Sequence, residues 1–198
     1  MKRTLILAGA LVASIAVNAQ VQRTCLAEGF SNASCGPCAG QNPAYNTLLG
    51  ANTTKVIGIK YQTNWPGVDP MNAQTQTQVG PRVTYYAVSG VPWGCLDGTA
   101  FAGASYSGAL ANLDQTEIDT RYAMSSPFSL VVTHSFSADF DSVFVSVSAT
   151  TPAAFSGTTM KLHVNLVEKD INFASAPGSN GETSFHSVFR DSYTTTSG

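Results

Sequence analysis

Residues 34–38 read Ser34-Cys35-Gly36-Pro37-Cys38, and this stretch decides the fold and the chemistry that we expect. Two cysteines separated by two residues can close a small disulfide ring or supply two ligands to a metal. Pro37 fixes a helical φ and is tolerated in a first helical turn, where its missing N–H leaves no gap. The spacing therefore predicts a helix that begins at Cys35, with Cys38 one turn later.

A cysteine at a helix N-terminus is chemically activated. The unpaired backbone N–H groups and the helix dipole stabilise a thiolate, which lowers the thiol pKa and makes the sulfur nucleophilic. Cys35 is therefore the predicted nucleophile, and Cys38 is the residue that forms a disulfide with it. A zinc site would need two more ligands, and the sequence has no second CxxC and no paired histidines, so we expect no metal and no cofactor.

The residues on either side of the CGPC motif complete a strand–helix–strand unit. Residues 25–30 predict a buried strand that runs into the motif, and residues 43–49 extend the helix, which ends at Gly50 or Asn52. Residues 55–61 are rich in β-branched and apolar side chains and predict a second central strand. This order is typical of a βαβ unit with parallel strands and a right-handed crossover.

The segment that follows is polar and irregular. Residues 63–71 contain Pro66, Gly67 and Pro70 and predict a loop. A polar helix rich in Gln and Thr comes next, and we expect it to break at Gly80-Pro81.

A hairpin and a helix then close this first domain. Gly90-Val91-Pro92 precedes a strand at residues 93–96, a turn at Asp97-Gly98 and a partner strand at residues 99–102. Apolar residues near helical spacing predict a last helix that ends around Met124, namely Leu110, Leu113, Ile118 and Tyr122.

After residue 125 the apolar pattern changes from helical to alternating. Apolar residues recur at every second position in residues 128–136, 143–147 and 160–166, with a weaker run near 185–189. Such runs, joined by turn residues, are typical of antiparallel strands in a sandwich. We therefore expect residues 20–124 to form an α/β domain and residues 125–198 to form a truncated β-sandwich.

The first residues predict export. Met1-Lys2-Arg3 precede an apolar run that ends at Val17, and Ala19 supplies a small residue before a cleavage site. The run is shorter than the roughly 20 apolar residues of a membrane span. Residues 1–19 are therefore a predicted signal peptide, and the expected location is the periplasm, the outer membrane surface or the exterior.

Charge and cysteine content narrow the function further. Only 11% of the residues are charged and the net charge is −2, which argues against a nucleic acid partner because such a partner needs a basic patch. Export implies an oxidising compartment, where cysteines are paired. Four cysteines allow three connectivities, of which we expect Cys35–Cys38 with Cys25–Cys95; buried free thiols at positions 25 and 95 are the alternative.

Strand, CGPC, helix, strand and then Gly-Val-Pro before a hairpin is an order that resembles the thioredoxin superfamily. The resemblance implies an α/β domain with a mixed central sheet and flanking helices, and a cis peptide bond before Pro92, which packs against the disulfide. The sequence departs from the family at two positions. Ser34 stands where tryptophan is usual, and Gly29 stands where a buried acid is usual, while the adjacent Glu28 faces the other way along its strand.

A closer resemblance is to the Omp28-related exported proteins of Bacteroidetes-type bacteria. It covers nearly the whole chain after the signal peptide and implies a location more than a reaction. The matching residues are Glu28, Phe30, Cys35, Cys38, Gly90-Val91-Pro92, Asp97-Gly98, Glu168 and the segment from His186 to Arg190.

Two functions follow from these patterns. In the first, the chain is a thiol–disulfide oxidoreductase that acts on a protein substrate: Cys35 attacks a disulfide, Cys38 resolves the mixed disulfide, and Pro92 holds the substrate strand. The substrate groove would then be lined by Trp93, Val91 and Ser34, although Trp93 equally fits a hydrophobic patch on the hairpin. In the second, the chain is a non-enzymatic cell-surface or outer-membrane-associated binding protein with a structural disulfide, a surface partner and no integral membrane span.

Overall fold

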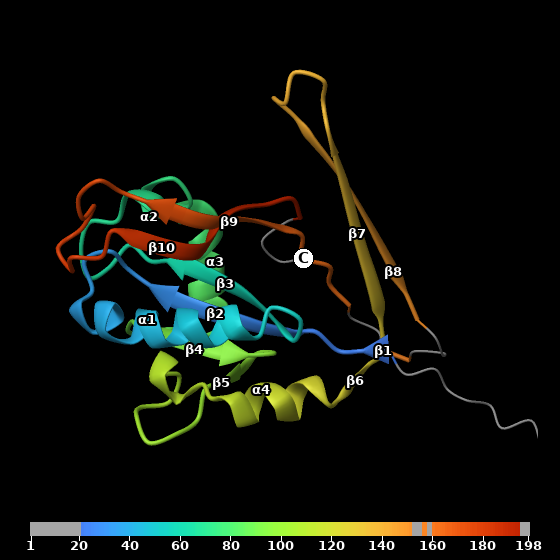
Figure 1. Cartoon of the computed structure of the whole chain (residues 1–198), viewed down its shortest axis with the longest axis horizontal. Coiled ribbons are helices and arrows are strands. Elements are labelled where there is room, and N and C mark those ends of the chain that lie inside the picture. Colours follow the sequence, from blue (N-terminus) through green and yellow to red (C-terminus); the bar gives the residue numbers. More distant parts are fainter. Residues whose placement is uncertain (1–20, 152–155, 158–159, 195–198) are drawn as a thin grey trace, which may run out of the picture. The chain divides into compact units, whose positions relative to one another are not determined.

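The structure is a computed structural model that describes residues 21–151, 156–157 and 160–194 (Figure 1). The predicted signal peptide lies outside these residues. The chain divides into one unit of residues 22–125 and 156–198 and another of residues 1–21 and 126–155. Two short strands, β1 (Val21–Gln22) and β6 (Ser125–Ser126), lie where one unit gives way to the other along the chain. No helix in the described part of the chain is long and apolar enough to cross a membrane.

A six-stranded mixed sheet with the order β5-β4-β2-β3-β10-β9 forms the centre of the larger unit. β2 and β3 are parallel, as the βαβ prediction requires, and β4 runs antiparallel to β2. β10 lies parallel to β3 and antiparallel to β9. The strands are β2 (Cys25–Ser31), β3 (Val56–Gln62), β4 (Trp93–Leu96), β5 (Thr99–Ala100), β9 (Asn165–Asn172) and β10 (Ser184–Ser192).

Helices cover both faces of the central strands. β2 shows why, because its successive side chains point to opposite faces of the sheet. Ala27 packs with Tyr45 and Ile118 on one face, and Phe30 packs with Val79 on the other. The helices are α1 (Gly36–Ala51), α2 (Pro70–Ala73), α3 (Gln76–Tyr85), α4 (Gln115–Tyr122) and the 3₁₀ turn η1 (Leu110–Asn112).

The expected break at Gly80-Pro81 is wrong, because α3 continues through both residues. Both are exposed. The Thr77 carbonyl, which loses its helical partner at Pro81, also belongs to an exposed residue, so water can satisfy it. Val79 is buried in the core and holds the helix on the sheet across this weak point.

The expected sandwich is also wrong for its last two strands. The run predicted at residues 160–166 is a strand only from Asn165 onward, where β9 begins, and both β9 and β10 extend the central sheet. Val188 of β10 lies beside Lys60 of β3, and the ring of Phe189 lies 5.1 Å from that of Tyr61. Alternation predicts that a strand buries one face, but it does not say which sheet receives the strand. The burial of Phe185, Val188 and Phe189 against the first half of the chain decides this pairing.

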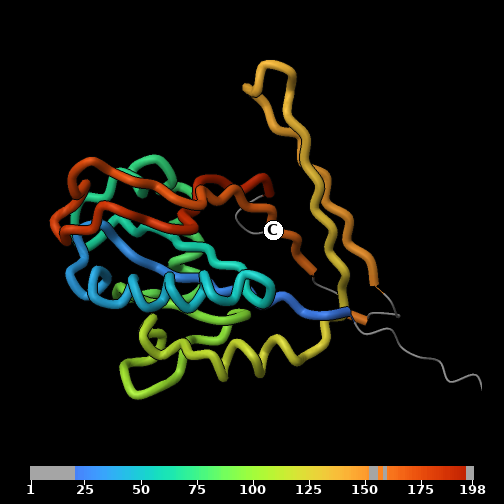
Figure 2. Tube along the Cα trace, viewed as in Figure 1, coloured from blue at the N-terminus to red at the C-terminus, as the bar shows by residue number. Residues whose placement is uncertain are grey.

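The smaller unit contains a β-hairpin made of β7 (Ser129–Phe136) and β8 (Val143–Thr150), which pair antiparallel along their whole length (Figure 2). The antiparallel strands predicted from the alternating pattern of these residues are confirmed. The register puts Val132 opposite Val147 and Phe136 opposite Val143, so one face of the ribbon is apolar. The opposite face is mostly Ser and Thr. Leu130, Val132 and Phe136 are 59%, 62% and 55% exposed, so none of the residues that the structure describes covers the apolar face.

Gly94 of β4 predicts a stability effect. A Cβ at this position would lie 2.5 Å from the Phe101 ring and 2.9 Å from the carbonyl oxygen of Glu28. We expect Gly94→Ala to lower the free energy of unfolding by about 1–3 kcal/mol, the usual effect of overpacking. Urea denaturation measures this change. Gly40→Ala is the matched control, because a Cβ on this α1 residue meets nothing within 4 Å; equal stability of the two variants would contradict the prediction.

Candidate functional site: the disulfide at the start of α1

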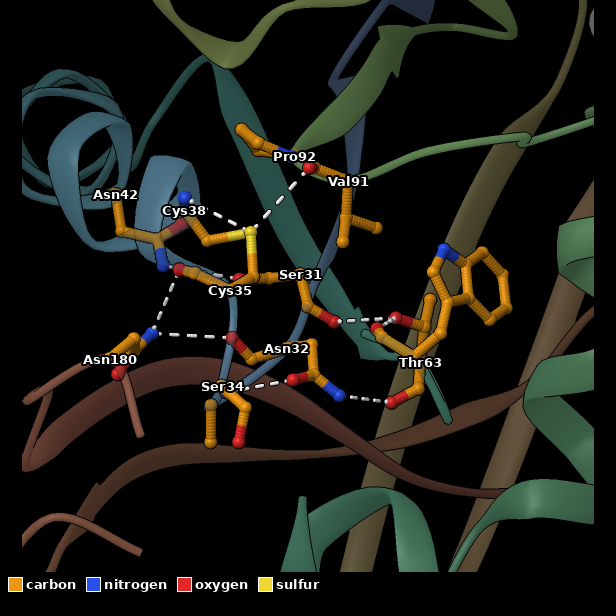
Figure 3. The surroundings of a disulfide bond; sticks show 12 residues. Ser31, Asn32, Ser34, Cys35, Cys38, Asn42, Thr63, Val91, Pro92 and Asn180 are labelled. Atoms are coloured by element: carbon orange, nitrogen blue, oxygen red, sulfur yellow. Dashed lines mark hydrogen bonds between the residues drawn. A yellow bond between two sulfur atoms is a disulfide. The ribbon is translucent and has the colours of Figure 1, made fainter. Parts of the chain in front are cut away.

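The Cys35–Cys38 disulfide lies at the N-terminus of α1, as the sequence predicts (Figure 3). Cys35 is the N-cap residue and Pro37 lies in the first turn. The backbone nitrogen of Cys38 lies 3.1 Å from the sulfur of Cys35, so its N–H points at that sulfur. The same nitrogen also lies 3.1 Å from the Cys35 carbonyl oxygen, so its N–H is shared between that oxygen and the sulfur. As a donor in the first turn of the helix, it is placed to stabilise negative charge on Cys35.

Val91 and Pro92 lie beside the disulfide. The Val91–Pro92 peptide bond is cis, as predicted. The carbonyl oxygen of Val91 lies 3.5 Å from the sulfur of Cys35, and the carbonyl of Pro92 accepts a hydrogen bond of 2.6 Å from the Tyr106 hydroxyl. The segment that precedes the β4–β5 hairpin therefore lies against the sulfur predicted to be the nucleophile.

Both cysteines of the disulfide are almost completely buried. Cys35 is 2% exposed and Cys38 is fully buried. Gly36 and Pro37, between them, are exposed. Access to the disulfide is therefore confined to the side formed by these two residues and the Val91–Pro92 turn.

Of the three predicted groove residues, Val91 lies beside the disulfide, whereas Trp93 and Ser34 contact other parts of the protein. The indole of Trp93 packs edge-on against Phe30, with ring centroids 5.7 Å apart, and lies 5.6 Å from the ring of Tyr86. Its position is therefore that of a residue in a hydrophobic patch, the alternative to a groove residue. The Ser34 hydroxyl donates a 2.7 Å hydrogen bond to the Val68 carbonyl and accepts one of 3.1 Å from the Ser179 N–H.

Two loops that we did not predict enclose the turn before Cys35. Asn32 accepts from the Ser34 N–H at 2.7 Å and donates to the Thr63 carbonyl at 2.7 Å. Asp69 accepts from the Ala33 N–H at 2.8 Å. Burial raises the pKa of the Asp69 carboxyl, and the backbone N–H groups that it accepts from offset part of that rise. An Asn two residues before a serine is a common turn signal and could have identified Asn32.

The second enclosing loop, residues 177–182, comes from the connection between β9 and β10. The side-chain amide of Asn180 donates hydrogen bonds of 3.2 Å to the carbonyls of both Asn32 and Cys35 (Figure 3). The Asn180 N–H donates to the Ala33 carbonyl at 3.1 Å. No local sequence pattern links these residues, because they are far apart along the chain.

The predicted Cys25–Cys95 disulfide is wrong, since both cysteines are buried free thiols. The strand register explains this result: Cys95 lies opposite Glu28, and Cys25 lies opposite Val56 on the other neighbouring strand. Burial, and then the nearby Glu28 carboxylate, raise the pKa of Cys95 to about 12, so this residue remains a thiol at neutral pH.

Glu28 faces away from α1, as predicted from the strand alternation. It is 1% exposed, forms an ion pair with Arg82 and accepts hydrogen bonds from the hydroxyls of Tyr61 and Tyr86. The next residue, Gly29, faces α1, where a Cβ would lie 3.3 Å from the Tyr45 hydroxyl oxygen. Tyr45 of α1 therefore fills the space beside Gly29.

The residues of the second half that the sequence singled out lie on β9 and β10. His186 pairs with Asp170 at 2.6 Å, and Arg190 pairs with Glu168 at 3.2 Å. Both are cross-strand pairs, which makes them part of the sheet edge rather than of the disulfide site.

Comparisons with known proteins give the fold and no more. No protein-family model and no curated protein matches the sequence. Among solved structures, HBP35 of Porphyromonas gingivalis has a similar fold, with a TM-score of 0.70 and 13% identity over 89% of this chain. The chain spans 58% of the length of that protein. The shared architecture is a mixed central sheet with flanking helices and additional strands.

Proposed function

We propose that this chain is an exported thioredoxin-like, Omp28-related protein that carries out thiol–disulfide exchange through Cys35 and Cys38. The observation that carries the proposal is the Cys38 N–H at 3.1 Å from the Cys35 sulfur, at the first turn of α1. A backbone N–H at the start of a helix stabilises a thiolate and so favours the nucleophilic form of Cys35.

The proposed reaction starts from the Cys35–Cys38 dithiol. The Cys35 thiolate attacks one sulfur of a protein disulfide, forms a mixed disulfide and expels the other substrate sulfur as a thiolate. Cys38 then loses its proton and attacks the Cys35 sulfur, which closes the Cys35–Cys38 bond and releases the second substrate thiolate. Two electrons and two protons pass to the substrate, and a dithiol reductant of the compartment restores the starting form.

The surroundings support one direction of approach for the substrate. The two loops cover Ser34 and the turn before Cys35, whereas Gly36 and Pro37 are exposed. The Val91 carbonyl, beside the Cys35 sulfur, is a backbone acceptor that an extended substrate segment can bond. A protein thiol or disulfide is therefore the proposed partner.

A second candidate function rests on a separate observation, the uncovered apolar face of the β7–β8 hairpin. Exposed apolar patches commonly mark interaction sites. If the protein is a non-enzymatic surface or outer-membrane-associated binding protein, the disulfide is structural and the hairpin carries the function.

Alkylation after mild reduction separates these two functions. We expect Cys35 to react with iodoacetamide faster than Cys38 at neutral pH, because Cys35 caps the helix while Cys38 lies inside its first turn. We also expect the reduced protein to reduce insulin disulfides in a coupled assay. Mass spectrometry of peptides identifies the modified residue. Faster modification of Cys38 would reverse the assigned roles, and a disulfide that resists mild reduction would favour the binding protein.

A further inference from the structure

The 177–182 loop is built to lie on the turn that carries Cys35. A Cβ on Gly178 would lie 2.2 Å from the Ala33 carbonyl oxygen, so only glycine permits this contact. Asn180 bonds the carbonyl of Cys35, and Ser179 bonds Ser34. The loop is therefore fixed against the disulfide site by several hydrogen bonds.

Glu182, at the end of this loop, places a carboxylate next to α1. One of its oxygens accepts a 2.6 Å hydrogen bond from the Asn180 amide, which is the amide that bonds Cys35. The carboxylate also accepts bonds of 2.8 and 3.1 Å from the Asn42 amide. Asn42 lies one helical turn after Cys38 on the buried side of α1. Glu182 thus contacts two residues that each lie directly against the CGPC motif.

Lys60 provides the opposing charge. It is 2% exposed, and its ammonium donates to Asn42 at 3.1 Å and to Asn46 at 2.8 Å. Burial lowers the pKa of Lys60 to about 8, and the Glu182 carboxylate opposes that decrease. Among the described residues no carboxylate lies within ion-pair distance of Lys60. Asn42 instead bridges the two charged groups, because its oxygen accepts from Lys60 and its amide N–H groups donate to Glu182.

Other carboxylates are engaged elsewhere. Glu28 is paired with Arg82 on the opposite face of the sheet, and Tyr45 fills the space at Gly29. Asp69, which also faces this region from the loop before α2, accepts hydrogen bonds from the backbone N–H groups of Ala33, Met71 and Asn72. Glu182 is therefore the carboxylate that is hydrogen-bonded to side chains of both α1 and the loop that holds the Cys35 turn.

We propose that Glu182 is a positioning residue of the exchange site, which holds the Cys35 turn through Asn180 and lowers the reduction potential of the Cys35–Cys38 pair. A nearby negative charge disfavours a thiolate, and a less stable reduced form makes a disulfide harder to reduce. Lys60 acts in the opposite direction. This inference rests on the proposed exchange function, because a potential has a role only if the pair cycles.

The test compares Glu182→Gln with wild type by equilibration with glutathione buffers and quantification of the reduced fraction. Glutamine removes the charge and keeps one of the two acceptor oxygens, so the bond from the Asn180 amide can remain while the 2.8 Å bond from the Asn42 amide is lost. We expect the equilibrium constant for oxidation to fall about tenfold, which corresponds to a potential about 30 mV higher. Cys35 alkylation at acidic pH should also become faster. Lys60→Met should shift both quantities in the opposite direction.

Glu168→Gln is the matched control, because it removes the same charge from the β9 strand, where Glu168 pairs with Arg190. Its equilibrium constant should equal that of wild type, and thermal unfolding will confirm that all variants are folded. A Glu182→Gln protein that equilibrates as wild type overturns the role of Glu182 and leaves the exchange function standing. A wild-type disulfide that does not equilibrate with glutathione overturns the exchange function itself, and with it the role of Glu182.

Discussion

Replacing Cys38 with serine is expected to trap the protein on its substrate as a stable mixed disulfide. Cys35 keeps the Cys38 backbone N–H that points at its sulfur, since this donor belongs to the main chain. Attack on a substrate disulfide therefore still occurs, but the sulfur that would release the substrate is gone. Turnover in an insulin reduction assay should fall to the uncatalysed rate.

The trapped complex is measured on non-reducing gels and by mass spectrometry after the variant is mixed with a protein that contains disulfides. Cys35→Ser is the matched control, and it should form no complex because Cys38 lies inside the first turn of α1 and is not its N-cap residue. A complex formed by Cys35→Ser and not by Cys38→Ser would exchange the roles of the two cysteines. Absence of a complex in both variants would indicate a structural disulfide.

Arg82→Met is expected to cause a large loss of stability. Glu28 is 1% exposed and its ion pair with Arg82 compensates its buried charge. Removal of one partner of a buried pair leaves the other charge uncompensated, which costs about 3–5 kcal/mol. We expect a decrease of about 3 kcal/mol in the free energy of unfolding, since the Arg82 side chain is partly exposed.

Urea denaturation measures this loss, and two further variants show its cause. Arg190→Met removes an arginine from the more exposed pair with Glu168 and should change stability by less than about 1 kcal/mol. Adding Glu28→Gln to Arg82→Met should restore part of the lost stability, because it removes the unpaired charge. If the double variant is less stable than Arg82→Met, the packing of the arginine stem rather than its charge holds α3 on the sheet.

Local pattern was sufficient to predict the centre of the fold. The βαβ unit from Cys25 to Gln62, the helix that begins after Cys35 and the Asp97-Gly98 hairpin are all present. Each depends on signals carried by adjacent residues, such as Pro37 in a first turn or a glycine at the second turn position. The cis bond at Pro92 came from the family resemblance and is present in the structure.

Long-range pairing could not be predicted in the same way. The alternation near residues 185–189 gave a strand correctly, but its neighbour is β3 and not a sandwich strand. The predicted Cys25–Cys95 disulfide does not form. The two cysteines lie on adjacent strands, but the register places Cys95 opposite Glu28 and not opposite Cys25. The contacts of the 177–182 loop could not be predicted, because hydrogen bonds between small polar side chains produce no periodic pattern in a sequence.

The distance along the chain between the CGPC motif and the loop that encloses it has a consequence for folding. Asn180 bonds the Cys35 carbonyl across 145 positions of sequence, and β10 inserts next to β3 only after the rest of the domain has been synthesised. Contacts of such high sequence separation form late, because closing a long loop costs entropy before any contact repays it. Cys35 and Cys38, three positions apart, can join much earlier. The two cysteines can therefore meet before the 177–182 loop covers their turn, so the redox conditions around the partly folded chain decide whether the disulfide forms first.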